Sequence, residues 1–91
     1  MNIKKIKLDL TVKLLNGSNN TNILQKVQDS MASWNAEVGR FKGMQLAEDF
    51  GLNSNLTKRT YAMQYDNCTL SVDVVHNQRT SNQYINGFSF L

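Results

Sequence analysis

A chain of 91 residues, of which 41% are hydrophobic, is long enough for one domain with one core, spanning residues 1–91, and too apolar for intrinsic disorder. It has no apolar run near the ~18 residues of a membrane span and no apolar leader after its first lysines, so we expect a soluble, cytoplasmic protein without a membrane partner. The net charge of +3 is unevenly distributed: residues 1–45 hold seven Lys or Arg against three Asp or Glu, and residues 46–91 hold three against four. This positive charge permits contact with nucleic acid, although such a charge more often serves solubility alone.

Residues 6–14 alternate apolar and polar side chains with a period of two. The apolar set is Ile6, Leu8, Leu10, Val12 and Leu14, and the polar set is Lys7, Asp9, Thr11 and Lys13. Such alternation predicts a strand with one face on the core and one mostly basic face toward solvent or a partner. A turn is expected over residues 16–20, where Asn and Gly tolerate the positive φ of tight turns.

A helix is predicted over residues 21–38. Its apolar residues recur at spacings of three and four, as on one face of a helix, and are Leu24, Val27, Met31, Trp34 and Val38. Gly39 follows at the position of a left-handed helix terminator. We expect Met31 and Trp34 to pack against the sheet, with Trp34 in the core.

The segment from Phe41 to Asn55 carries a less regular pattern. Its apolar residues Phe41, Met44, Ala47 and Phe50 recur every three residues, as on a short helix. Gly51 and a turn at residues 53–55 follow. A short helix is therefore predicted here, and a fifth strand over residues 43–50 is the alternative.

Alternation returns at Thr57 and predicts the remaining strands. A strand to Tyr65, a two-residue turn and a second strand over residues 68–74 form a tight hairpin. The residues expected on its core face are Tyr61, Met63, Tyr65, Cys68, Leu70, Val72 and Val74. A polar loop over residues 76–82 leads to a last strand, in which Tyr84, Phe88 and Phe90 are expected on the core face.

Together these elements predict an α+β fold. We expect a four-stranded, mainly antiparallel sheet with one long amphipathic helix packed on one face, in the order β-α-(short α)-β-β-β. The opposite, polar face of the sheet would carry Lys5, Lys7, Lys13 and Lys58. Because antiparallel sheets often leave one face to water, this face is either solvated or a binding surface.

Patterns for catalysis, metals or cofactors are missing from the sequence. His76 is the only histidine, and Asp73 lies three residues before it on one strand, so the two would point to opposite faces and could not form a dyad. One cysteine and one histidine are too few for a zinc site, and the single Gly17 does not make a phosphate-binding loop. Cys68 suits a small buried thiol. We expect no enzyme activity, no cofactor and no metal.

The leading hypothesis is a small non-enzymatic binding protein that occupies and blocks a surface of a larger protein or nucleoprotein complex. Phage and mobile-element inhibitors of host defence machinery, such as anti-CRISPR proteins, are small proteins of this style, and the analogy is one of size. The alternative is a small basic nucleic-acid-binding accessory protein, and a third hypothesis is a structural subunit of a larger assembly. An edge strand could also pair two copies into a homodimer.

The residues expected at a partner interface are the exposed cations Lys5, Lys7, Lys13, Lys58, Arg59 and Arg79. Recognition of single-stranded nucleic acid on an open sheet needs exposed aromatic side chains. The predicted register places Tyr61 and Tyr65 with the core. Inverting that strand would place both beside the lysines and would favour nucleic-acid binding.

Overall fold

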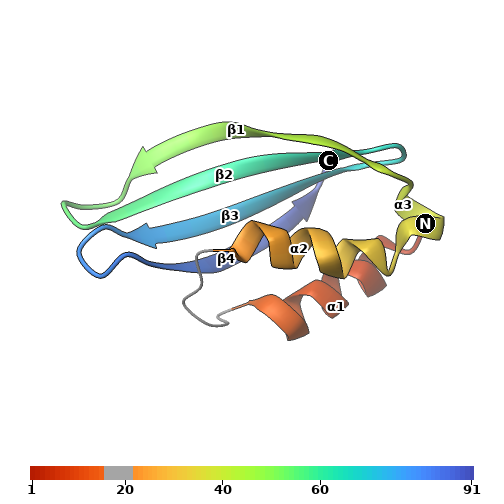
Figure 1. Ribbon diagram of the computed structural model, residues 1–91, viewed down its shortest axis with the longest axis horizontal. Coiled ribbons are helices and arrows are strands. Elements are labelled where there is room, and N and C mark those ends of the chain that lie inside the picture. The colour runs from red at the N-terminus through yellow and green to blue at the C-terminus, as the bar shows by residue number, and fades with distance from the viewer. Residues whose placement is uncertain (16–21) are drawn as a thin grey trace.

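The computed structural model describes residues 1–15 and 22–91, and there it shows three helices followed by a four-stranded antiparallel sheet (Figure 1). The elements are α1 (Ile3–Leu14), α2 (Ile23–Ala32), α3 (Asn35–Val38), β1 (Phe41–Gly51), β2 (Leu56–Tyr65), β3 (Thr69–Asn77) and β4 (Asn82–Phe90). The strands lie in the sheet in the order β1-β2-β3-β4. The predicted α+β class and antiparallel sheet are confirmed, whereas the predicted β-first order is wrong.

Residues 6–14, predicted as the first strand, lie in α1. The inward stripe of this helix is Ile6, Leu10 and Leu14. Ile6 and Leu10 are fully buried, whereas Leu8 and Val12 are 63% and 77% exposed. The prediction failed because residues four apart share a face both on a strand and on a helix, so the period-two pattern contains a helical stripe.

The helix predicted over residues 21–38 is divided into α2 and α3. Its buried residues are Ile23, Val27, Met31 and Val38. Trp34 is the N-cap residue just before α3 and is only partly buried, with its indole Nε1 donating a hydrogen bond to Asp9 Oδ2 (3.0 Å). Gly39 ends α3 with a positive φ of 84°, but its ψ of −162° lies outside the left-handed helical region that was predicted for a terminator. The turn predicted over residues 16–20 and the predicted helix start at residue 21 lie outside the described residues.

The segment from Phe41, predicted as a short helix, is strand β1, and the alternative of a strand here is confirmed. β1 pairs antiparallel with β2, but its register shifts twice, at Lys42 and at Ala47. Each shift is a β-bulge, in which one extra residue moves the following side chains onto the other face. The bulge at Lys42 puts Phe41 and Met44 on one face although they are three residues apart, and this spacing imitates a helix.

The predicted β2–β3 hairpin and its core face are confirmed. Its buried core residues are Met63, Tyr65, Leu70, Val72 and Val74, with Tyr61 and Cys68 partly buried beside them. In β4, a register shift opposite Asp73 moves Tyr84 to the other face, where it pairs with Val75. The predicted core position of Tyr84 is therefore wrong, and Ile85 fills the core instead.

The helices cover only one side of the sheet. α1 and α2 pack mainly against β4, and their buried residues join those of β2, β3 and β4 in one core. Leu15, just after α1, forms a parallel bridge with Ile85 on the outer edge of β4. β1 forms the edge of the sheet opposite to β4, away from α1 and α2 (Figure 1).

Candidate functional site

The cations predicted at a partner interface do not share one face of the molecule. Three of them lie on α1: Lys5, Lys7 and Lys13. Arg79 lies in the turn between β3 and β4. Lys58 and Arg59 are neighbours on β2, so their side chains point to opposite faces of the sheet, and Arg59 Nε lies 3.7 Å from Asp49 Oδ2. The predicted basic sheet face is therefore not formed by the described residues.

Two of the α1 cations have partners inside the chain. Lys13 Nζ lies 3.2 Å from Asp9 Oδ1, and Lys5 Nζ lies 5.9 Å from the centre of the Trp34 ring. The hydrogen bond from Trp34 is the main reason why the pKa of Asp9 lies below its usual value, with a further contribution from Lys13. These contacts attach α1 to the start of α3.

Exposed apolar side chains gather instead on β1. Met44 and Leu46 are 44% and 50% exposed, and both point to the helix side of the sheet, since Met44 stands directly opposite the buried Met63. Phe41, at the start of the strand, is exposed on the same side. We call Phe41, Met44 and Leu46 the β1 stripe. It is open to solvent because α1 and α2 pack mainly against β4.

A pocket of about 210 Å³ opens beside the start of the β1 stripe, between the helices and the first two strands. It is lined by Gln28, Met31, Ala32, Asn35, Gly39, Phe41 and Tyr65. The rings of Phe41 and Tyr65 meet edge to face, with their centres 5.5 Å apart. Sites for drug-sized ligands usually measure about 300 Å³ or more, so this pocket suits a single large side chain.

Tyr65 contributes its ring to the pocket wall. Its hydroxyl oxygen is buried and has no hydrogen-bond partner among the described residues. Burial, with a smaller effect from Cys68, raises the pKa of Tyr65 to about 12. The phenol therefore stays neutral at physiological pH, and its role at the pocket is one of packing.

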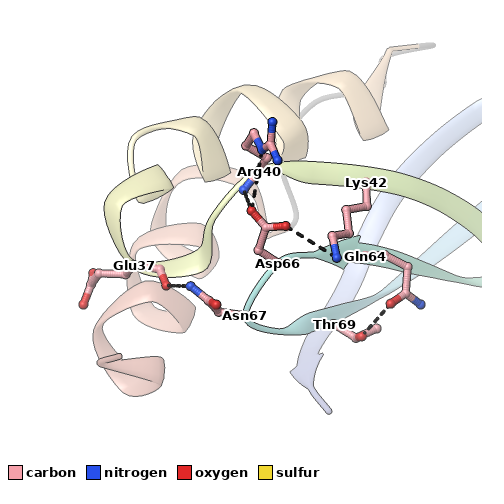
Figure 2. Close-up of polar contacts among 7 residues, drawn as sticks. All are labelled: Glu37, Arg40, Lys42, Gln64, Asp66, Asn67 and Thr69. Carbon is pink, nitrogen blue, oxygen red and sulfur yellow. Dashed lines mark hydrogen bonds and ion pairs between the residues drawn. The ribbon is translucent and has the colours of Figure 1, made fainter.

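Polar contacts fix the start of β1 next to the pocket (Figure 2). The backbone N–H of Arg40 donates to Asp66 Oδ2 (2.8 Å), and Lys42 Nζ lies 3.5 Å from Asp66 Oδ1. The hydrogen bond from Arg40 is the main cause of the lowered pKa of Asp66, with Lys42 acting in the same direction. On the other side of the turn, Asn67 Nδ2 donates to the carbonyl oxygen of Glu37 (2.8 Å). We call Arg40, Asp66 and Asn67 the hairpin clamp, because they attach the β2–β3 turn to the α3–β1 connection.

Gly39 permits this close approach. A Cβ at this position would overlap the Cβ of Asp66. Gly39 also lines the pocket, so the same backbone segment serves the clamp and the pocket wall. A hydrogen bond from Thr69 Oγ1 to Gln64 Oε1 (2.9 Å) closes the base of the hairpin (Figure 2). The hairpin clamp thus fixes Gly39 and the start of β1, which line one wall of the pocket.

A different surface lies on the face of the sheet opposite the helices. Cross-strand neighbours form a row there, which we call the open-face row: Phe50, Lys58, Val75 and Tyr84. The aromatic residues at its two ends are exposed, and Lys58 stands between them. The adjacent row carries Glu48 and Asp73, so the charge of this face is mixed. Sequence analysis missed the row because both aromatic positions depend on bulges.

The described ranges give little sign of catalytic or metal chemistry. Asp73 and His76 point to opposite faces of β3, as predicted, and Asp73 accepts a hydrogen bond from Thr60 Oγ1 (2.7 Å). Across residues 1–15 and 22–91, no three His, Cys, Asp or Glu side chains are placed to hold a metal ion. In the same ranges, no helix has both the length and the apolar character to cross a membrane.

Comparison with known proteins adds no assignment to this geometry. No family model, no curated protein and no solved structure matches the chain. The β1 stripe, with its adjoining pocket, is therefore the candidate functional site on structural grounds.

Proposed function

We propose that the protein is a non-enzymatic binding protein that docks the β1 stripe and the adjoining pocket onto a larger protein or nucleoprotein partner. The observation that carries the proposal is the row of exposed apolar side chains on β1, which leads into a preformed pocket. By binding in this way, the protein would cover the partner's surface and block its access to other molecules. An inhibitor that acts by occupancy, of the kind that phages and mobile elements direct against host defence machinery, is the biological role that we propose.

The composition of the site supports a protein partner. Met and Phe side chains are enriched at the centres of protein interfaces, and Arg40 and Lys42 supply a polar rim. A pocket sized for one side chain fits the anchoring residue on which binding energy usually concentrates. Each Å² of the stripe that a partner removes from water contributes roughly 25 cal/mol.

Site-specific photocrosslinking tests this proposal in cells that contain the partner. A photoreactive amino acid at Leu46 should give a discrete cross-linked adduct heavier than a dimer of the chain, and Met44→Lys in the same chain should abolish it. The matched control is the same photoreactive group at Leu8, an apolar residue that is also exposed but lies on α1. Equal adducts from both sites, or none from Leu46 in a chain with a native circular dichroism spectrum, would contradict the proposal.

A second candidate function, binding of single-stranded nucleic acid, is favoured by the open-face row. Exposed aromatic side chains beside a lysine can stack bases and contact phosphate. Fluorescence anisotropy of labelled single strands should then show binding that weakens with salt by about 0.7 log units per log of salt for each phosphate contact. Tyr84→Ala and Lys58→Gln should weaken binding, whereas Lys26→Gln on α2 should not. Absence of binding at low salt removes this candidate.

A further inference from the structure

The two edges of the sheet are not equivalent. On β4, the bridge from Leu15 to Ile85 and the packing of α1 and α2 cover part of the outer backbone. On β1, the outer backbone has no hydrogen-bonded neighbour among residues 1–15 and 22–91, over the eleven residues Phe41–Gly51. A long exposed edge strand with apolar side chains is a template for pairing with another strand. The charged and apolar side chains of β1 indicate which strand would pair with this edge.

The side chains of β1 complement those of a second β1 that runs in the opposite direction. Lys42 lies near the start of the strand and Glu48 near its end, with Gln45 midway between them. In an antiparallel pair centred on Gln45 of both copies, each Lys42 stands opposite the other copy's Glu48. Met44 then stands opposite Leu46 on the helix side. Opposite charges and apolar residues are both favourable cross-strand pairs, and each pair here occurs twice.

Small residues occupy the positions between these pairs. In the same register Gly43 stands opposite Ala47 of the other copy. No atom of residues 1–15 or 22–91 lies within 4 Å of the position that a Cβ of Gly43 would take, so these residues leave the space beside it open. Glycine in a strand often marks a place where another backbone approaches closely. The pair of Gly43 and Ala47 therefore leaves room on its face of the sheet for the larger side chains of the neighbouring pairs.

We propose that two copies of the chain associate through antiparallel pairing of their β1 edges, around a two-fold axis at Gln45, into a homodimer with an eight-stranded sheet. The strand order becomes β4-β3-β2-β1-β1-β2-β3-β4, and the interface is isologous, as is usual for a dimer with two-fold symmetry. This inference goes beyond the proposed function, because it assigns the backbone edge of β1 to a second copy of the chain, whereas the proposed function assigns the exposed surface of the stripe and the pocket to a different protein.

The symmetry determines where the stripes lie in the dimer. A two-fold axis perpendicular to the sheet keeps both helix layers on the same side. The two β1 stripes then meet at the centre of that side, and each pocket opens beside them. Since neighbouring strands are about 4.8 Å apart, the floor from one β2 to the other spans about 14 Å. The dimer thus forms an apolar trough between two helix layers.

Sedimentation equilibrium of the purified full chain tests the proposal. The average mass should rise from monomer to dimer as the concentration increases from the micromolar range. Glu48→Lys replaces two attractive pairs by two repulsive ones, so it should raise the dissociation constant roughly tenfold. Lys26→Glu, an equally large charge reversal on the exposed face of α2, is the control and should leave the dissociation constant unchanged.

A charge-swap series tests the register. Lys42→Glu should weaken the dimer as Glu48→Lys does, and mixing the two variants should give a heterodimer that is tighter than either homodimer. The double variant should recover dimerisation, which separates the interface effect from any loss of the contact between Lys42 and Asp66. Circular dichroism confirms that each variant is folded. A monomer at every concentration, or a dimer that responds to none of these reversals, overturns the proposal.

Discussion

A side chain at position 39 would collide with Asp66. The backbone there also has a φ of 84°, which residues other than glycine adopt only at a cost in free energy. Gly39→Ala should therefore lower the free energy of unfolding by about 1 to 3 kcal/mol, as measured by urea denaturation. Gly51→Ala is the control, since no atom in the described part of the chain lies within 4 Å of its Cβ position, and it should change stability by about 0.5 kcal/mol or less. Equal effects of the two substitutions would show that the hairpin clamp does not depend on this approach.

Asp66 gives the clamp a dependence on pH. Its pKa is lowered in the folded chain, first by the backbone N–H of Arg40 and then by Lys42, so its contribution to stability is present above the unfolded pKa and is lost as the pH falls through the folded pKa. Asp66→Asn keeps an acceptor oxygen but loses the charge. The difference in urea midpoint between the wild-type chain and Asp66→Asn should shrink as the pH is lowered from neutrality to below about 4. A difference that is constant with pH would assign the clamp to neutral hydrogen bonding alone.

At the scale of elements, α1 makes a clear prediction, because Leu8 and Leu10 would be equivalent on a strand but lie on opposite sides of a helix. Leu10→Ala should lower the free energy of unfolding by about 2 to 5 kcal/mol, since Leu10 is fully buried. Leu8→Ala should change it by about 0.5 kcal/mol or less. Urea denaturation followed by circular dichroism measures both, and equal losses would restore the strand interpretation.

The sequence of α1 held the information that the period-two interpretation overlooked. Asn2 accepts a hydrogen bond from the backbone N–H of Lys5 (3.1 Å), so a capping residue stood directly before the segment. The spacing from Ile6 to Leu10 satisfied both periods, so the apolar pattern alone could not distinguish a helix from a strand. The β2–β3 hairpin was predictable because its core-face residues alternate without a bulge on either side of a two-residue turn.

The candidate site was less accessible to sequence analysis than the fold. Met31 and Tyr65 were predictable as core residues, but the pocket between them forms only where the β2–β3 turn meets the α3–β1 connection. β1 was misassigned because its two bulges break the alternation. Gly43, which follows the bulge at Lys42, was the available signal, since glycine is unfavourable in helices and common at bulges. The predicted interface consisted of cations, three of them on α1, and it included none of the exposed apolar residues of β1.

At the scale of the whole molecule, one side of the sheet is packed and the other is open, and the proposed homodimer makes stability depend on concentration. The thermal unfolding midpoint should rise by a few degrees for each tenfold increase in protein concentration, because dimerisation draws the equilibrium toward the folded chain. Differential scanning calorimetry measures this shift, with Glu48→Lys as the comparison. A midpoint independent of concentration in the wild-type chain would contradict the dimer.

The bridge between Leu15 and Ile85 hinders the addition of a further strand at the outer edge of β4. A sheet with two free edges can add further strands at both edges without limit, and fibrils grow in this way. Here the β4 edge is covered in part from within the chain, so pairing of two β1 edges leaves only partly covered edges among the described residues. Concentrated solutions should consequently remain free of thioflavin-positive fibrils, and substitutions that detach Leu15 from β4 should be the ones that allow polymerisation to begin.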